Sequence, residues 1–424
     1  MRLTLLVAGL LAATVTFAAP PLTLLQAEQI ALARDAESSR LNLLGEAADH
    51  QAVAERQLPD PRLSLGAQNL PTDTFSFDQE PMTQLRLALT QQFPAGDSLQ
   101  LAGNRRQLGG DVQRQQRRDR QLKILEGVRL AWLELLHWQH AQNILREDAQ
   151  LFRQLRDITR SLYQVGRARQ QDLLRAEVEL ATLDDRLLQA RLREQEVQAM
   201  LARWIGDNNA RRPLAGEHPA AASWSRQPSD IDAALIAHPS VQQRDLQIEI
   251  AETGVALARE AYKPAWGLEV AYGWRNGDNA DGSDRSDFFS AGVSLQLPLF
   301  TGQRQDRRAL AAQQEREAAR EQRLEWLRQL QAQVAAEQAR VEQFDARLVL
   351  YRDQLVSQAR ARAEAALAAY QSNATDFPDL MRSYLAWQAL RLEQLRLQTD
   401  AAQAHARLAY FLPVSQSVME SPDA

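Results

Sequence analysis

The sequence predicts an α+β membrane protein built from two copies of one unit, in which a helix is followed by a strand hairpin, a very long helix and another helix. The first observation is a repeat: residues 163–166 (Tyr-Gln-Val-Gly) and 172–175 (Asp-Leu-Leu-Arg) return 207 positions later as Tyr-Gln-Ser-Asn and Asp-Leu-Met-Arg. The second is an alternating apolar pattern in four segments that lie between helical stretches. A repeat of this length indicates that one supersecondary unit has been duplicated.

The start of the chain has the features of an export signal. Arg2 is basic, residues 3–17 are apolar, and small residues precede an expected cleavage site after Ala18, so residues 1–18 are predicted to be a signal peptide. The chain contains no cysteine, which excludes disulfides, thiol catalysis, cysteine metal sites and a lipidated N-terminal cysteine. A net charge of −5 over 424 residues gives no indication of nucleic-acid binding, which requires a basic face.

Helical periodicity and helix-breaking residues divide the chain into two repeats. The long helices have narrow apolar stripes among many Arg, Glu and Gln residues, which is typical of coiled-coil walls and not of a globular core. We expect a first repeat at 19–206, with helices at 23–56, 98–162 and 172–205, and then a linker at 207–230. We expect a second repeat at 231–413, with helices at 231–262, 303–370 and 379–412, and then a tail at 414–424.

Four alternating segments are predicted to be strands that span a membrane. They lie at 62–70, 84–93, 265–274 and 287–298, and each is apolar on one side and small or polar on the other. The residues expected to face lipid are Leu63, Leu65, Leu85, Leu87, Trp266, Leu268, Val270, Tyr272, Val293 and Leu295. A soluble sheet covered by helices is the alternative. Because four strands cannot close a barrel, membrane insertion requires several chains, and three would supply twelve strands.

The sequence offers no site for catalysis. Glu134, His137 and His140 share one helical face and could approach a metal ion, but the second repeat has no equivalent set, so a fortuitous arrangement is the simpler interpretation. No nucleophile elbow, phosphate loop or dinucleotide fingerprint is present. We therefore expect no enzyme, no cofactor and no metal site.

The duplicated architecture, the Tyr-x-x-Gly turn before Asp-Leu-Leu, and the prolines that flank the hairpins (Pro61, Pro94, Pro264 and Pro298) resemble the TolC-like outer membrane efflux protein family. The resemblance implies a homotrimer with a twelve-stranded β-barrel in the outer membrane and a long α-helical barrel in the periplasm. It also implies a passive duct of a tripartite efflux system, whose partners are a periplasmic adaptor protein and a proton-driven inner-membrane pump.

The resemblance also assigns candidate sites at the two helical turns. The adaptor would contact the tips at Tyr163, Val165, Gly166, Arg167, Ser372 and Asn373, and a periplasmic aperture would be formed by Tyr370, Asp376, Asp379 and Arg382. Thr375 stands where the family has an arginine, and Arg382 where it has an aspartate, so the aperture cannot use the family's set of salt bridges. An equally weighted alternative is that Asp376 and Asp379 only cap the following helix. Asp172 is expected to be the cap in the first repeat.

Residues 59–66 and 78–84 are similar to the heavy-metal branch of this family, which suggests metal ions as the exported substrate. Two other classes remain as alternatives to an export duct. One is a periplasmic coiled-coil adaptor, which would need an additional β-rich domain between its helices. The other is a periplasmic metal-binding helical protein, which would need more clustered ligands than Glu134, His137 and His140.

Overall fold

The computed structural model describes residues 20–216, 219, 221, 224 and 230–413, so the expected signal peptide and C-terminal tail lie outside the described residues. The chain divides into two compact units. Unit 1 contains the described parts of Met1–Asp35, Lys123–Arg226 and Ala336–Ala424, and unit 2 contains those of Ala36–Leu122 and Gln227–Ala335. Each unit combines segments of both repeats. The repeat is therefore a unit of sequence and not a compact unit of structure.

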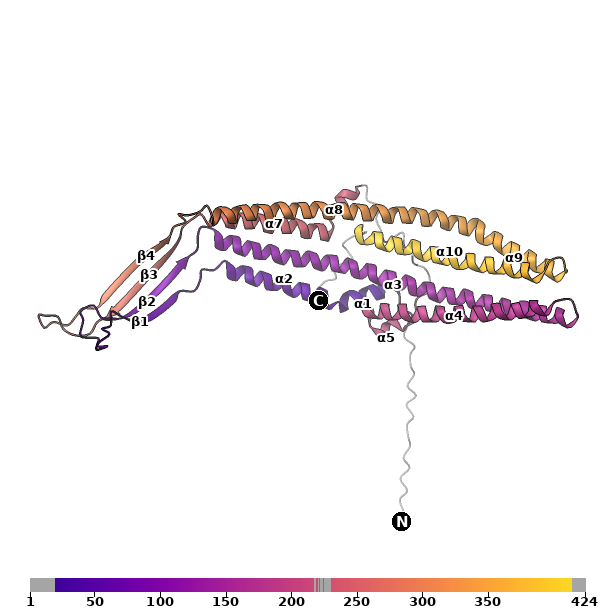
Figure 1. The fold of residues 1–424 in the computed structure, drawn as a ribbon, viewed down its shortest axis with the longest axis horizontal. Helices are drawn as coiled ribbons and strands as arrows, with labels where there is room; N and C mark the ends of the chain where they lie inside the picture. Colours follow the sequence, from indigo (N-terminus) through magenta and orange to yellow (C-terminus); the bar gives the residue numbers. More distant parts are fainter. Residues whose placement is uncertain (1–19, 217–218, 220, 222–223, 225–229, 414–424) are drawn as a thin grey trace, which may run out of the picture. The chain divides into compact units, whose positions relative to one another are not determined.

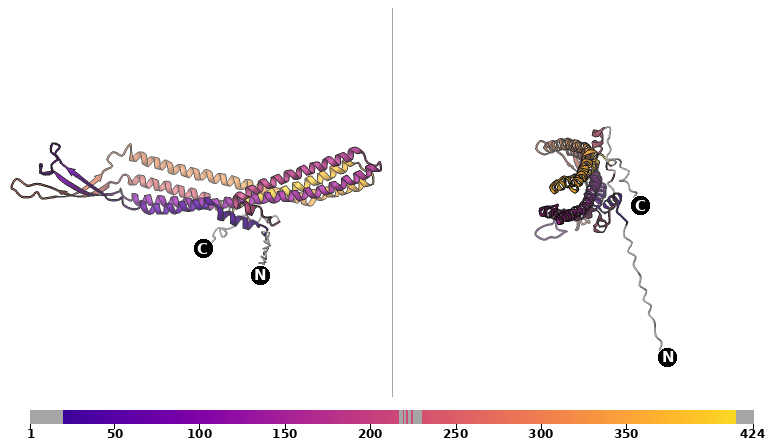
Figure 2. Two further views of the ribbon diagram at one scale, coloured as in Figure 1. Left: turned by 90° about the horizontal axis from the view of Figure 1, so that it is seen from below. Right: turned by 90° about the vertical axis from the view of Figure 1, so that its right-hand side faces the viewer.

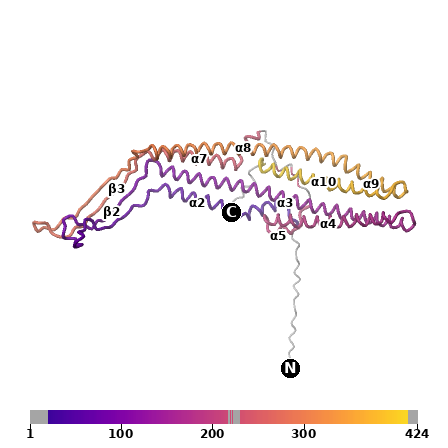
Figure 3. Tube along the Cα trace, viewed as in Figure 1, coloured from indigo at the N-terminus to yellow at the C-terminus, as the bar shows by residue number. Residues whose placement is uncertain are grey.

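Unit 2 contains a four-stranded antiparallel sheet in which the strands follow one another in chain order (Figure 1). The strands are β1 (Arg62–Gln68), β2 (Gln84–Phe93), β3 (Ala265–Trp274) and β4 (Phe288–Gln296). Hairpins join β1 to β2 and β3 to β4, and the two hairpins meet where β2 pairs with β3 (Figure 3). Helices α2 (Ala36–Glu55) and α7 (Pro239–Glu260) lead into β1 and β3.

The two longest helical stretches occupy equivalent places in the two repeats. Helix α3 (Ser98–Gln164) contains 67 residues and is α-helical throughout, which corresponds to a length of about 100 Å. Its counterpart begins at Gln305 and ends at Gln371, 207 positions later, and is formed by α8 (Gln305–Leu350), the π-helical turn η2 (Tyr351–Leu355) and α9 (Val356–Gln371). The structure thus replaces the single α-helix expected at 303–370 by two α-helices joined through a π-helical turn.

Two other expected helices are also interrupted. Residues 23–56 form α1 (Leu24–Arg34) and α2, because Asp35 takes an extended conformation with ψ 102°. Residues 231–262 form α6 (Ile231–Ile236) and α7, because Pro239 disfavours a helical conformation for His238, which instead caps α7 through its side chain. The expected linker contains the short helix α5 (Asp207–Ala210) and a parallel bridge between Leu214 and Leu22.

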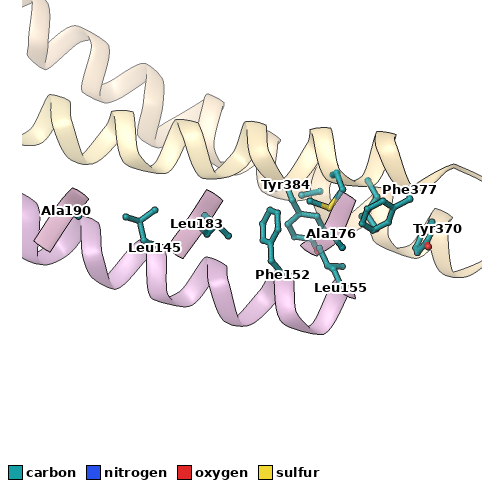
Figure 4. Packing of buried hydrophobic residues seen from close by; sticks show 12 residues of the cluster. Leu145, Phe152, Leu155, Ala176, Leu183, Ala190, Tyr370, Phe377 and Tyr384 are labelled. Carbon is teal, nitrogen blue, oxygen red and sulfur yellow. The ribbon is translucent and has the colours of Figure 1, made fainter. Parts of the chain in front are cut away.

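Unit 1 is built from helical hairpins. Helix α4 (Gln170–Ile205) follows α3, and α10 (Phe377–Phe411) follows α9 and packs along it (Figure 2). Alternate turns of these helices contribute to one apolar cluster, which we call the tip cluster (Figure 4). Its buried members are Leu145, Phe152, Leu155, Ala176, Leu183, Ala190, Ala363, Tyr370, Phe377, Leu380, Met381 and Tyr384.

Among the helices that the structure describes, none combines the length and the apolar character needed to cross a membrane.

Candidate functional site

Apart from Phe288, which lies opposite Gly273, the strand register places the large apolar side chains of all four strands on one face of the sheet. Leu65 lies opposite Leu87, Leu87 opposite Tyr272, and Tyr272 opposite Phe289. Phe93 and Trp266 are also paired, and their rings stack at 3.9 Å with an interplanar angle of 9°. All ten residues that the sequence analysis assigns to lipid are exposed: Leu63, Leu65, Leu85, Leu87, Trp266, Leu268, Val270, Tyr272, Val293 and Leu295. We call this surface the apolar face.

The opposite face of the sheet carries small and polar side chains. Gly267 and Gly273 lie close to neighbouring side chains, so that an added Cβ would be 2.8 Å from Ser294 Oγ and 1.7 Å from Gln84 Oε1, respectively, and these side chains would have to move. Arg86 forms an ion pair with Glu269, whose second carboxylate oxygen accepts a 3.3 Å hydrogen bond from Thr90 Oγ1. This pair is not evident from the sequence, because Arg86 and Glu269 come from different repeats and only the strand register brings them together.

Two arginines connect the loops that follow β1 and β3. Arg285 Nη1 donates to the carbonyl oxygens of Asp78 at 3.0 Å and Asn276 at 3.1 Å. Arg275 Nη1 donates to the Pro81 carbonyl oxygen at 3.0 Å, and its guanidinium lies 3.9 Å from the centroid of the Phe288 ring. The two loops are therefore joined to each other at the ends of their hairpins.

The two helical turns share one hydrogen-bonding pattern. At the first turn the Arg167 N–H donates to the Leu162 carbonyl oxygen at 2.8 Å, and Gly166 has a φ of 75°. At the second turn the Ala374 N–H donates to the Ala369 carbonyl oxygen at 2.8 Å, and Asn373 has a φ of 62°. This is the pattern of a Schellman C-cap, which needs a residue that tolerates positive φ. The six predicted adaptor contacts are all exposed: Tyr163, Val165, Gly166, Arg167, Ser372 and Asn373.

The four residues of the predicted aperture occupy three different environments. Tyr370 is 8% exposed in the tip cluster, with its hydroxyl 3.4 Å from Thr159 Oγ1 and its ring 5.7 Å from that of Phe377. Burial raises the pKa of the Tyr370 hydroxyl. Asp376 is the N-cap of α10 and accepts a 3.1 Å hydrogen bond from the Asp379 N–H. Asp379 and Arg382 form an exposed ion pair one turn apart.

Asp376 caps the following helix, as the alternative interpretation expects. In the first repeat a different residue occupies the N-cap position. Arg169, not Asp172, occupies the N-cap position of α4, and the Asp172 carboxylate accepts a 3.2 Å hydrogen bond from the Arg169 N–H. Asp172 therefore lies at the third helical position, where a carboxylate completes a capping box. The expectation that Asp172 is the N-cap is wrong by three residues. Whether Tyr370, Asp379 and Arg382 surround an aperture remains a prediction.

Charged and polar side chains, of which Asp148 is buried, connect the helices of unit 1. The Asp148 side chain is 3% exposed, and its Oδ1 accepts a 3.0 Å bond from Arg391 Nη1, which joins α3 to α10. Arg391 also pairs with Glu147 at 2.5 Å, and Arg186 of α4 donates to Gln388 of α10 at 3.1 Å. Burial raises the pKa of the Asp148 carboxyl. The contacts of Arg391 with Asp148 and of Arg186 with Gln388 are not evident from the sequence, since the partners are more than 200 residues apart.

Glu134 and His137 have protein partners in unit 1. Both oxygens of Glu134 accept 2.9 Å bonds from Arg396 Nη1, and Oε2 also accepts from Gln403 at 3.0 Å. His137 is buried with its Nδ1 3.3 Å from Thr399 Oγ1, and burial lowers the pKa of its imidazole. In the described part of the chain, no group of three or more His, Cys, Asp or Glu residues could hold a metal ion.

The chain resembles known proteins in part of its sequence and in its fold. Residues 231–412 match the family model described as outer membrane efflux protein. No match to the chain was found among curated protein sequences.

Several solved structures have the same fold at low sequence identity. VceC, an outer membrane protein of Vibrio cholerae, is 18% identical with a TM-score of 0.76, and the alignment covers 92% of this chain and 97% of VceC. A membrane protein from Pseudomonas aeruginosa is 16% identical with a TM-score of 0.79, covering 92% of this chain and 90% of its own. CusC, whose crystal structures concern conformational changes accompanying folding and transmembrane channel formation, is 14% identical with a TM-score of 0.78, and the alignment covers 91% of each chain. The second repeat is therefore similar in sequence to the outer membrane efflux protein family, and the chain shares its fold with VceC and CusC.

Proposed function

We propose that the chain is one protomer of a trimeric outer membrane channel that conducts substrates passively out of the cell. The observation that carries this proposal is the apolar face, which continues across all four strands and is exposed. Large contiguous apolar surfaces are unfavourable in water, at about 25 cal/mol per Å². Lipid removes that cost. The apolar face therefore supports insertion in the membrane and disfavours the alternative of a soluble sheet covered by helices.

The open edges of the sheet support a shared barrel. Within the described chain, β1 pairs only with β2 and β4 only with β3, so both outer strands have one unpaired edge. An unpaired strand edge is not tolerated in hydrocarbon, because each unsatisfied backbone group costs several kcal/mol. Since the four strands alternate in direction, β4 of one copy can pair antiparallel with β1 of the next. Three copies then close a barrel of twelve strands.

The helical parts support a duct, in preference to an enzyme or a metal-binding protein. Glu134, the carboxylate of the one candidate metal set, already accepts hydrogen bonds from Arg396 and Gln403. The long helices α3 and α8 carry many charged residues and are suited to the walls of a water-filled tunnel in the periplasm. The proposed role needs no chemical step and no cofactor, because substrate moves through the tunnel without reacting.

The exposed turns support docking of a periplasmic adaptor and, through it, an inner-membrane pump. Val165 of the first turn is 69% exposed, and Ser372 and Asn373 of the second turn are exposed as well. The prediction that metal ions are the substrate rests only on the resemblance of residues 59–66 and 78–84 to the heavy-metal branch.

Asp379 and Arg382 are the residues best placed to form an aperture. Both side chains are more than half exposed, so they can face a symmetry axis, whereas Tyr370 is buried against Phe377. Three copies of Asp379 near one axis would repel one another, and three copies of Arg382 would compensate that repulsion. A change in the spacing of these groups would alter the passage of ions.

The first experiment separates membrane fractions from expressing cells and compares unheated with heated detergent extract on a gel. The proposal expects a heat-labile band of trimer size in the outer membrane fraction. A monomer in the soluble periplasmic fraction would contradict it, because the apolar face would then be covered by protein.

A further inference from the structure

The junction between the two hairpins gives a template for a contact that the single chain cannot make. Because the hairpins are repeats of one another, β2 and β4 are equivalent strands, as are β1 and β3. Residues of β3 lie 203 positions after their counterparts in β1, so that Trp266 corresponds to Leu63. Residues of β2 lie 206 positions before their counterparts in β4, so that Thr90 corresponds to Gln296. The two hairpin registers, Leu63 opposite Leu89 and Trp266 opposite Leu295, agree with both offsets.

We propose that β4 of one copy pairs with β1 of the next in the register that β2 and β3 show within the chain. The inference rests on the proposed trimeric barrel and adds the residues that meet in it. Thr90 lies opposite Glu269 at the internal junction, so Gln296 lies opposite Gly66 between copies. The other pairs follow in the same way and join 294–299 of one copy to 63–68 of the next.

This register keeps the apolar face continuous across the contact. Leu295 lies opposite Ala67, Leu297 opposite Leu65 and Leu299 opposite Leu63, and all of these residues continue the apolar face. The Ser294 and Gln296 side chains meet Gln68 and Gly66 on the polar face. The stacked pair of Phe93 and Trp266 at the internal junction is replaced by Leu299 and Leu63.

The register also accounts for two exposed leucines after β4. Leu297, Leu299 and Phe300 are 55%, 72% and 88% exposed and lie beyond the last residue of the strand. The Leu299 N–H donates to the Leu297 carbonyl oxygen at 3.0 Å, a local turn that opens when the segment extends beside a new strand. In the repeat-derived register, Leu297 and Leu299 gain strand partners and lie against Leu65 and Leu63.

A competing register would maximise the overlap of the two strands as they stand in one chain. Gln296 would then lie opposite Arg62 and residue 290 opposite Gln68, which also keeps the apolar residues on one face. It leaves Leu297 and Leu299 without strand partners, because β1 begins at Arg62. The two registers differ by four residues, or about 13 Å along the strand.

Paired cysteines distinguish the two registers, and the native chain contains no cysteine that could interfere. The test variant is Gln296→Cys with Gly66→Cys, where an added Cβ at Gly66 would meet no atom within 4 Å. Opposite residues in an antiparallel pair have Cα atoms about 4.5 to 5.5 Å apart, which is within reach of a disulfide. The matched control is Gln296→Cys with Arg62→Cys, and each single variant checks that trimers still form.

After oxidation and heating without reductant, the Gln296/Gly66 variant is expected to run as a covalent trimer and the Gln296/Arg62 variant as a monomer. If the Gly66 substitution prevents assembly, Ser294→Cys with Gln68→Cys tests the same register. Heat-labile trimers that cross-link only through Arg62, or through neither proposed pair, would overturn the register and leave the proposed channel intact. Absence of any trimer from the unsubstituted protein would overturn the proposed function instead.

Discussion

The sheet of unit 2 and the tip cluster of unit 1 place the same kinds of side chain in opposite environments. In the tip cluster, Phe377 and Leu380 are 1% and 0% exposed and contact residues of neighbouring helices. In the sheet, Leu65 is 69% exposed although its neighbours on the same face are also large and apolar. A protein that folds in water alone would bury both sets. This difference is what the proposed channel requires, because lipid and further copies of the chain would cover the sheet whereas neighbouring helices already cover the tip cluster.

Removing apolar volume from the tip cluster should reduce stability more than any other change. We expect Leu380→Ala to destabilise the helical packing by about 2 to 5 kcal/mol, because it leaves a cavity among buried side chains. Leu65→Ala makes the same chemical change at an exposed position of the sheet and serves as the matched control. Guanidinium unfolding followed by circular dichroism measures both. Equal losses would contradict the assignment of different environments.

The second change introduces charge on the apolar face. If lipid covers that face, Leu268→Arg or Leu295→Arg should destabilise the barrel by roughly 2 to 4 kcal/mol near the middle of the membrane. Ser294→Arg places the same side chain on the polar face of β4, where water is expected, and should be tolerated. The fraction of heat-labile trimer in unheated gels measures the effect. Full trimer yield from Leu295→Arg would show that its side chain does not face lipid.

The third change separates capping from charge at the second helical turn. Asp376→Ala should cost about 1 kcal/mol, because the Asp379 N–H loses its hydrogen-bond acceptor. Asp376→Asn retains an acceptor and is an equally good N-cap residue, so it should restore most of that loss while removing the charge. The unfolding midpoints of the two variants distinguish an effect of the cap from an effect of the charge. If Asn is no better than Ala, the carboxylate charge matters more than the cap.

The fourth test uses pH and the buried carboxyl of Asp148. Because burial raises the Asp148 pKa, the folded state binds more protons than the unfolded state between the ordinary Asp pKa of about 4 and the raised value. Stability contributed by this group should therefore fall as pH rises through that window and then become constant. The difference in unfolding midpoint between the wild type and Asp148→Asn, measured against pH, isolates the effect. A difference that does not change with pH would contradict a raised pKa.

The smallest effect on stability is expected for the exposed pair of Asp379 and Arg382. Exposed ion pairs contribute little to folding, so replacing both residues by alanine should leave the unfolding midpoint nearly unchanged. If the pair lines an aperture, the same double variant should increase single-channel conductance in planar bilayers. Arg352→Ala with Asp353→Ala removes another exposed pair, remote in sequence from the turn, as a control. Unchanged conductance in the Asp379/Arg382 variant would exclude the aperture role.

Most of the secondary structure could be predicted, because periodicity and helix-breaking residues are local signals. The strand at 265–274 was predicted to the residue, and the helix predicted at 172–205 begins only two residues earlier. The break at Ala237 and His238 was missed although Pro239 signals it, since the periodic pattern continues across the proline. The π-helical turn at Tyr351–Leu355 had no counterpart in the first repeat from which it could be inferred.

The candidate sites were predictable only where one short segment defines them. The two helical turns satisfy this condition, since Gly166 and Asn373 can adopt the positive φ that ends their helices. The polar contacts between distant segments could not be predicted in this way. Arg86 with Glu269, Arg391 with Asp148 and the arginines that join the strand loops depend on which side chains face one another after folding.

The amino-acid sequence alone reveals the duplication, because the same short motifs recur 207 positions apart. It also specifies the two faces of each strand and the positions of the helical turns, because residues close together in the chain encode them. Only the tertiary structure decided that the four strands form one open sheet with a single apolar face, that each compact unit contains parts of both repeats, and that Tyr370 is buried while Asp379 and Arg382 are exposed. The physical reason is that strand pairing and side-chain burial depend on contacts between segments that lie as many as 200 or more residues apart, and local periodicity carries no record of those contacts.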